Sequence, residues 1–354
     1  MRPGDTPLSS AARATVTLVR PARPRATASM ADSNSTTLAL TVGDPSGIGP
    51  EIVLAALGDP RVTALGAIVV VGPGALRPAA IPLAERGHSR AAARVTWLDS
   101  GGPARWEMGK PQAECGRAAL AALRTGHELA LAREVDALVT APVSKEALHL
   151  AGEPVEGQTE LLGRWSGVTR FEMVAVAGAL RVMLATRHMP LTRAIASITR
   201  ERVLDRLQLF GETLRGFGIA TPHLALAGLN PHAGEHGLLG SEEDDILRPA
   251  IEDARARGVN VSGPVSPDSV FLLASRGAFD GVLALYHDQA FIPIKLLSQD
   301  GGVTVIAGLP YLRVSPVHGT AYDIAGRGLA SAENLIAALE QAARLAGAAR
   351  TART

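Results

Sequence analysis

Short apolar, often β-branched runs alternate with longer helical stretches from Thr37 onward. This alternation is typical of a mostly parallel sheet covered by helices, because parallel strands need crossover connections that helices usually supply. The predicted strands are residues 38–42, 67–71, 137–140, 173–177, 181–185, 224–227, 281–285 and 303–307. The predicted helices are residues 50–57, 115–132, 200–217, 243–257 and 331–346. Gly178 and Ala179 lie between two strand runs and predict one antiparallel hairpin in this α/β fold.

The size and charge of the chain exclude several classes of protein. Its 354 residues, 47% of them hydrophobic, suffice for one large or two smaller packed domains. The 35 basic and 34 acidic side chains nearly cancel, so neither nucleic acid nor an anionic membrane is expected as the main partner. No run approaches the roughly 20 apolar residues that a membrane span needs. An acidic ligand would therefore be bound by local cations.

The single cysteine and the amino-terminal segment bear on location. Cys115 alone can form neither an intramolecular disulfide nor a thiolate-rich metal site, so a reducing, cytoplasmic location is expected. Residues 1–36 are rich in Arg, Ala, Pro, Ser and Thr and lack apolar periodicity, which predicts a disordered extension. A transit peptide or a true start at Met30 would explain this segment equally well.

Three histidines lie shortly after separate predicted strands. These are His188, His232 and His287. Ligands of open α/β sheets bind beyond the carboxyl ends of the strands, and imidazole is the commonest neutral metal ligand. The three histidines therefore predict one divalent metal site, although each alone could simply bond a neighbouring carbonyl. Asp288 and Asp268 could orient the histidines or add ligands, and the set suits zinc, magnesium, cobalt, nickel or manganese.

Two glycine-rich segments are candidates for phosphate binding. Residues 43–51 form a turn that enters a helix, and this turn either holds an anion on its N–H groups or is only a tight connection. Residues 72–74 begin a dinucleotide-binding fingerprint, but Arg77 replaces its third glycine. A standard Rossmann site is therefore not expected, and the cofactor-binding residues stay unassigned.

Lysines are scarce, which makes each one informative. Only Lys110, Lys145 and Lys295 occur, and the last two fall within motif-like segments. Lys295 follows His287 by eight residues and has apolar neighbours, a setting that an idle ammonium would avoid. Arg313 adds a second cation in the same region. Together they predict binding of a phosphorylated or carboxylate substrate near the metal.

Several segments together carry a family resemblance. They are residues 43–51, 157–160, 230–235, 286–289 and 318–321. From about residue 38 to 345 the chain resembles the 4-hydroxythreonine-4-phosphate dehydrogenase (PdxA) family. The resemblance implies two α/β/α domains around a central cleft, as in isocitrate and isopropylmalate dehydrogenases. Residues 37–145 with 305–350 would form the first domain, and residues 146–304 the second, with metal-binding and dimerisation elements.

The resemblance also implies an activity. Family enzymes use NAD, or NADP, and a divalent metal to oxidise 4-hydroxythreonine 4-phosphate to 2-amino-3-oxo-4-phosphooxybutanoate. That product decarboxylates to 3-amino-2-oxopropyl phosphate, on the route to pyridoxal phosphate. A metal on the substrate hydroxyl would stabilise the alkoxide from which hydride leaves. The enzymes are implied to be homodimers with the active site at the interface.

The implied roles fall on particular residues. His188, His232 and His287 match the metal ligands. Substrate-binding positions match Gln158, Thr159, Lys295, Thr304 and Arg313, of which Thr159 helps hold the phosphate. Lys295, Asp288 and Asp268 are the expected catalytic residues, and Lys295 would supply positive charge and a proton.

Departures from the family pattern concern the substrate. Gln158, Thr304 and Val317 replace a usual histidine, asparagine and acid, and Ala290 replaces a glycine. Threonate or erythronate 4-phosphate dehydrogenases, and an aromatic dihydrodiol branch, resemble the chain nearly as well. Retained Thr159 and Arg313 favour a phosphorylated substrate. From another class, a phosphate acyltransferase-like enzyme would need neither NAD nor the three histidines.

Overall fold

The computed structural model describes residues 36–85, 93–155, 157–298 and 302–351. The predicted extension, residues 1–36, lies outside the described residues except for Thr36. Thr36 is buried, and its Oγ1 accepts a hydrogen bond of 2.5 Å from Nη2 of Arg350. The folded part of the chain therefore includes Thr36.

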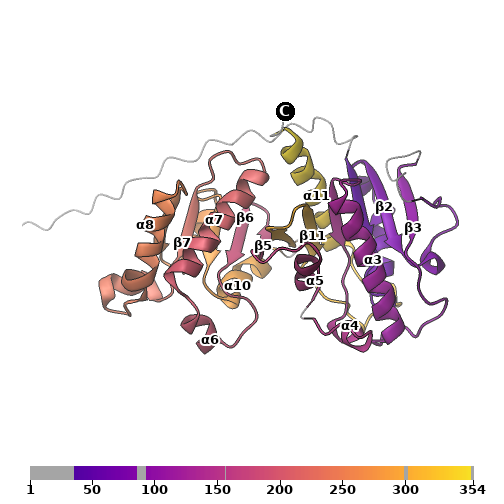
Figure 1. Cartoon of the computed structure of the whole chain (residues 1–354), viewed down its shortest axis with the longest axis horizontal. Helices are drawn as coiled ribbons and strands as arrows, with labels where there is room; N and C mark the ends of the chain where they lie inside the picture. Colours follow the sequence, from indigo (N-terminus) through magenta and orange to yellow (C-terminus); the bar gives the residue numbers. More distant parts are fainter. Residues whose placement is uncertain (1–35, 86–92, 156, 299–301, 352–354) are drawn as a thin grey trace, which may run out of the picture.

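The described residues form one sheet of eleven strands in the order β3-β2-β1-β4-β11-β10-β5-β6-β9-β7-β8. The strands are β1 Thr37–Thr41, β2 Ala67–Gly72, β3 Val95–Asp99, β4 Ala137–Thr140, β5 Glu172–Ala177, β6 Leu180–Leu184, β7 Leu224–Ala227, β8 Val261–Val265, β9 Gly281–Ala284, β10 Val303–Ala307 and β11 Leu312–Pro316. In Figure 1, β2 and β3 lie toward one end of the elongated molecule and β7 toward the other, with β5 and β11 between them.

Most neighbouring strands run parallel, as predicted. The hairpin of β5 and β6 is antiparallel and turns at Gly178, whose φ is +56°, which confirms the expected Gly-first turn. Strand β10 lies between β5 and β11 and runs opposite to both. The sequence did not predict these two further antiparallel pairs. The central three strands thus join two parallel halves of the sheet.

The helices of the described residues include all five that were predicted. They are α1 Gly49–Leu57, α2 Pro60–Thr63, α3 Ala113–Leu131, α4 Lys145–Leu150, α5 Gln158–Trp165, α6 Leu191–Ala196, α7 Arg200–Gly216, α8 Arg248–Ala256, α9 Val270–Ser275, α10 His287–Leu297 and α11 Glu333–Thr351. The predicted helix 243–257 begins with a π-helical turn, Glu243–Leu247, that runs into α8. None of these helices has the length and apolarity needed to cross a membrane.

The packing of helices on the two faces of the sheet explains where a pocket can form. On one face, a single apolar core joins β1, β10 and β7 to α1, α7, α8 and α11. The opposite face carries two separate clusters, one of α3, α4 and α5 over β1, β2 and β4, and one of α9 and α10 over β6, β7 and β9. Part of β5, β10 and β11 is therefore left uncovered between the two helical groups.

The predicted domain boundaries stay a prediction. One continuous sheet runs through both proposed domains. Helix α5, which the sequence assigns to the second domain, packs through Leu161 and Leu162 in the same cluster as α3. The α/β class with a large central sheet is confirmed.

Candidate active site

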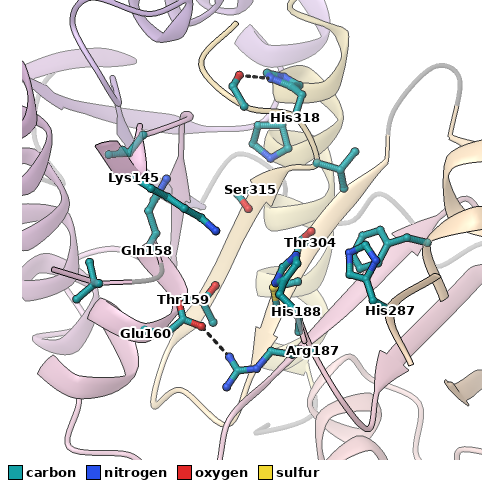
Figure 2. Close-up of a pocket in the computed structure, with 18 of the residues that line it drawn as sticks. Lys145, Gln158, Thr159, Glu160, Arg187, His188, His287, Thr304, Ser315 and His318 are labelled. Atoms are coloured by element: carbon teal, nitrogen blue, oxygen red, sulfur yellow. Dashed lines mark hydrogen bonds and ion pairs between the residues drawn. The ribbon is translucent and has the colours of Figure 1, made fainter. Parts of the chain in front are cut away.

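A pocket of about 900 Å³ lies over the uncovered central strands. The floor of the pocket consists of alternate side chains of the central strands. Val303, Val305 and Val314 point into the core on one face of the sheet, so the residues next to them along each strand face the pocket. The neighbours on the pocket side are Met173 of β5, Thr304 of β10, and Arg313 and Ser315 of β11. Helices α4 and α5 border one side and α10 the other, as the labelled side chains in Figure 2 show.

Arg313 is the central buried cation of this pocket. Its side chain is only 4% exposed, and burial lowers its pKa to about 10. Nη2 donates to Oγ1 of Thr140 at 2.7 Å and to Oε1 of Gln158 at 3.2 Å. Among the described residues, its Nε has no hydrogen-bond partner, and Glu160, the carboxylate that lines the pocket, pairs with Arg187 instead. A buried guanidinium without an anionic partner is costly, so the site suits an anionic ligand.

The first turn of α5 lies beside Arg313. Gln158 donates from Nε2 to the carbonyl of Ala141 at 3.1 Å, which fixes its amide so that Oε1 faces Arg313. Thr159 follows, largely buried, and lines the pocket. The amino terminus of a helix and a hydroxyl next to a guanidinium form a favourable environment for a phosphate. The pocket thus brings together four of the residues that the sequence predicts to bind substrate, namely Gln158, Thr159, Thr304 and Arg313.

His188 and His287 form the opposite side of the pocket. They follow β6 and β9, which are adjacent and parallel, and their ring centroids lie 4.8 Å apart. Nδ1 of His287 is 2.7 Å from Oδ1 of Asp288. Burial, and then the neighbouring His287 and Lys145, lowers the pKa of His188. The neutral imidazole that results is the form that binds metals.

His232 is not part of this pair. Residues 232–236 all have φ between 43° and 79°, so the chain after β7 makes a left-handed turn. This turn leaves the side chain of His232 60% exposed, with its Nδ1 3.9 Å from Oδ2 of Asp268 and outside the pocket lining. The described residues contain no group of three side chains placed to hold a metal. The structure of one chain therefore brings together two of the three predicted ligands.

Lys295 lines the pocket from α10, but not in the setting inferred from its neighbours. Ile294 is buried, but Ile292, Leu296 and Leu297 are 61%, 69% and 54% exposed, so most of the apolar sequence neighbours of Lys295 do not enclose its ammonium group. An α-helix places these residues on its outer surface, which sequence neighbours alone do not reveal. The expected catalytic roles of Lys295, Asp288 and Asp268 stay predictions.

Two cationic residues of the pocket, Lys145 and Arg187, were not among the predicted site residues. Lys145 lines it from the start of α4, where Ser144 caps the helix by accepting from the N–H of Ala147. Arg187 lies beside His188, and its Nη1 is 2.9 Å from Oε1 of Glu160 (Figure 2). Both follow strands, so the strand-end signal that selected the histidines could have found them.

The glycine-rich turn at residues 43–51 is a tight connection in which four of the N–H groups are already bonded within the protein. The N–H of Ser46 donates to Oδ1 of the buried Asp44, and those of Asp44, Gly47 and Ile48 donate to backbone carbonyls. Gly43 has φ +74°, and a Cβ there would lie 2.3 Å from the carbonyl oxygen of Pro142. The turn therefore uses these amides internally, and its glycine is needed for close packing.

Comparisons with known proteins agree with this architecture. Residues 53–342 match the family described as pyridoxal phosphate biosynthetic protein PdxA. The chain is 39% identical to 4-hydroxythreonine-4-phosphate dehydrogenase of Desulforapulum autotrophicum, over 88% of this chain and 95% of that protein. It is 40% identical to D-threonate 4-phosphate dehydrogenase of Salmonella typhimurium, over 88% and 99%.

A solved structure gives the same result. The 4-hydroxythreonine-4-phosphate dehydrogenase of Klebsiella pneumoniae matches with a TM-score of 0.81 at 39% identity, covering 88% of this chain and 100% of that one. The resemblance stated from the sequence motifs is confirmed, and the relatives are named as dehydrogenases, so the chain is an oxidoreductase. The chain belongs to the PdxA family.

Proposed function

We propose that this protein oxidises 4-hydroxythreonine 4-phosphate at its C3 hydroxyl with NAD, giving NADH and 2-amino-3-oxo-4-phosphooxybutanoate, which loses CO₂ to leave 3-amino-2-oxopropyl phosphate. Membership of the PdxA family supports the reaction class. The observation that carries the substrate class is the buried, incompletely paired Arg313 in a pocket that also contains the histidine pair.

The charges of the pocket suit a small phosphorylated acid. Lys145, Arg187, Lys295 and Arg313 line it against one carboxylate, Glu160. We assign the phosphate to the side formed by Arg313, Thr159 and the amino terminus of α5, because these groups can donate several hydrogen bonds to one anion. The reacting end of the substrate then extends toward the histidines.

The residues present fit a divalent metal ion. His188 and His287 lie with their rings close together at the ends of adjacent strands, and the lowered pKa of His188 keeps it neutral. These two histidines would hold the ion, which could be zinc, magnesium, cobalt, nickel or manganese. When bound, it supplies Lewis-acid polarisation of the substrate oxygen. Lys295 supplies a cation to the same region and can hand a proton to the product carbanion.

We propose that the protein is a homodimer and that His232 of the partner subunit completes the metal site. Two features support this: His232 is exposed and outside the pocket of its own chain, and apolar side chains of α10 are exposed beside the pocket. Leu191 and Ile195 of α6 are also exposed, at 54% and 40%. Exposed apolar side chains that gather into a patch mark an interaction site.

D-Threonate 4-phosphate is the second candidate substrate. The 40% identity to the Salmonella typhimurium enzyme favours it as much as the first relative favours 4-hydroxythreonine 4-phosphate. The two acids share the phosphate and the C3 hydroxyl and differ at C2, which carries an amino group in one and a hydroxyl in the other. Arg313 and Thr159 would serve either one.

Reduction of NAD, followed with each substrate in parallel, tests the proposal. We expect NADH with at least one of them, and a ratio of kcat/KM values that identifies the physiological substrate. Repeating the assay with NADP in place of NAD shows which of the two is the cofactor. The residues that bind the cofactor are unassigned. The absence of NADH and NADPH with both acids, in metal-loaded protein, would remove the proposed function. We also propose a cytoplasmic location, since the only thiol, Cys115, is buried and unpaired.

A further inference from the structure

A buried carboxylate lies next to the pocket and has no part in the chemistry described so far. Glu172 is the first residue of β5, is 2% exposed, and precedes Met173 of the pocket floor. Its Oε1 accepts from the N–H of Met173 at 2.9 Å. Its oxygens also lie 3.4 Å from Nε of Arg187 and 3.5 Å from Nε of Arg206. A buried charge persists only where such partners offset its desolvation.

Arg187 connects this carboxylate to both sides of the pocket. Its Nη1 lies 2.9 Å from Glu160 of α5, the helix whose first turn carries Gln158 and Thr159 (Figure 2). The next residue along the chain is His188. The guanidinium also lies 5.1 Å from the centre of the Phe171 ring. One planar side chain is thus held by contacts from α5 and from the start of β5.

The segment that carries Arg187 is also fixed at its other end. Thr186 donates from its buried Oγ1 to the carbonyl of Leu285 at 2.7 Å, which ties the end of β6 to the segment leading to His287. This hydrogen bond and the parallel pairing of β6 with β9 hold the two histidine-bearing segments together. In the described part of the chain, the Arg187–Glu160 pair is the ion pair that joins this side to α5.

We infer that Arg187 and Glu172 are positioning residues that set the separation between the histidine side of the pocket and the phosphate side on α5. The inference rests on the proposed function, in which one small substrate contacts both sides at once. A rigid ion-paired bridge holds that separation at the length of the substrate. A displacement of about 1 Å between reacting groups can cost about 100-fold in rate.

Arg187→Met tests the bridge because it keeps an unbranched apolar stem and removes the guanidinium that pairs with Glu160. We expect kcat/KM for the phosphorylated substrate to fall about 10- to 100-fold. Inhibition by inorganic phosphate probes the α5 side alone, and zinc binding probes the histidine side alone. Both should stay within about twofold of wild type, because each side remains intact. A parallel loss of phosphate or zinc binding would overturn the inference, as would an unchanged kcat/KM.

Stability and position can be separated with a second substitution. Arg187→Met leaves Glu172 with one guanidinium fewer, so the melting temperature should fall. The double variant E172Q/R187M removes the uncompensated charge, and we expect it to recover the melting temperature while kcat/KM stays low. Arg187→Lys keeps the charge without the planar fork and should restore kcat/KM only in part. Recovery of kcat/KM together with stability would show that Arg187 is merely structural.

Arg170 offers a matched control. It pairs with Asp205 at 2.6 Å and Glu212 at 2.7 Å, close to the same network but outside the pocket lining. Arg170→Met should lower stability and leave kcat/KM unchanged, and an equal loss of kcat/KM would contradict the inference. Metal-loaded wild type that reduces neither NAD nor NADP with either acid would remove the proposed function, whereas an active wild type with a fully active Arg187→Met variant would remove only this inference.

Discussion

Mixing two inactive variants tests whether His232 serves the site of the other subunit. His188→Ala and His232→Ala should each lower NAD reduction on the order of 100-fold, because loss of a ligand removes several kcal/mol of metal-based stabilisation. In the proposed symmetric dimer, each site would use His188 from one chain and His232 from the other. A mixed dimer of the two variants then has one doubly damaged site and one intact site.

The recovered activity follows from this arrangement. Random exchange of subunits makes about half of the dimers mixed, and each has one intact site of two, so about a quarter of wild-type activity returns. The assay is NADH formation after co-refolding or co-expression, with metal content measured on the same samples. His188→Ala mixed with His287→Ala is the control, because these rings lie together in one chain, 4.8 Å apart, and neither mixed site is whole.

Two outcomes would refute the reasoning. If the first mixture stays inactive although mixed dimers are present, all three histidines act within one chain or His232 is not a ligand. If the control mixture regains activity as well, the pairing of His188 with His287 on one side is wrong.

Three further predictions test single features of the site. Arg313→Met should lower kcat/KM for a phosphorylated substrate about 10- to 150-fold, which corresponds to the loss of a charge-assisted hydrogen bond of about 1.5–3 kcal/mol. The kcat/KM for the dephosphorylated analogue should not change. Equal losses for both substrates would contradict the phosphate assignment. Burial raises the pKa of Tyr311 from 10.0 to about 12, so its contribution to the free energy of unfolding is present below pH 10 and lost as the pH rises to about 12. In denaturant titrations over that window, the free energy of unfolding of wild type should fall by up to about 1.4 kcal/mol per pH unit more than that of Tyr311→Phe, because the opposite titration of Arg313 is common to both proteins. A chelator should stop NADH formation and added divalent ions should restore it, whereas full activity in metal-free protein would exclude the metal role.

The strands that sequence predicted best are those in which every residue is buried. Residues 224–227 are all apolar, residues 137–140 and 303–307 each contain one threonine, and the structure gives the same bounds. Strand β11 was missed because the strands were predicted from apolar runs, and in β11 Arg313 and Ser315 alternate with Leu312 and Val314. That alternation is the pattern of a strand with one polar face, and it is what places Arg313 in the pocket. Strand β8 was missed because Gly263 and Pro264 lie within it.

The site was only partly visible in the sequence. Strand ends predicted that His188, His232 and His287 would meet. His188 and His287 do so because β6 and β9 are neighbours in the sheet. The position of His232 depends on a left-handed turn in which most residues are of types that rarely adopt positive φ. No local sequence pattern predicts this turn. The Arg187–Glu160 pair joins residues 27 positions apart and depends on how α5 packs against the sheet. Tertiary packing, rather than local sequence, set these two features.

The most direct test of the account compares each candidate acid with its dephosphorylated analogue in metal-loaded protein, with NADH and CO₂ followed together. We predict NADH formation with 4-hydroxythreonine 4-phosphate or D-threonate 4-phosphate, and a kcat/KM lower by at least about 100-fold when the phosphate is absent. Equal turnover of phosphorylated and dephosphorylated acids, or no NADH from either, would contradict a metal-assisted dehydrogenase for phosphorylated hydroxy acids.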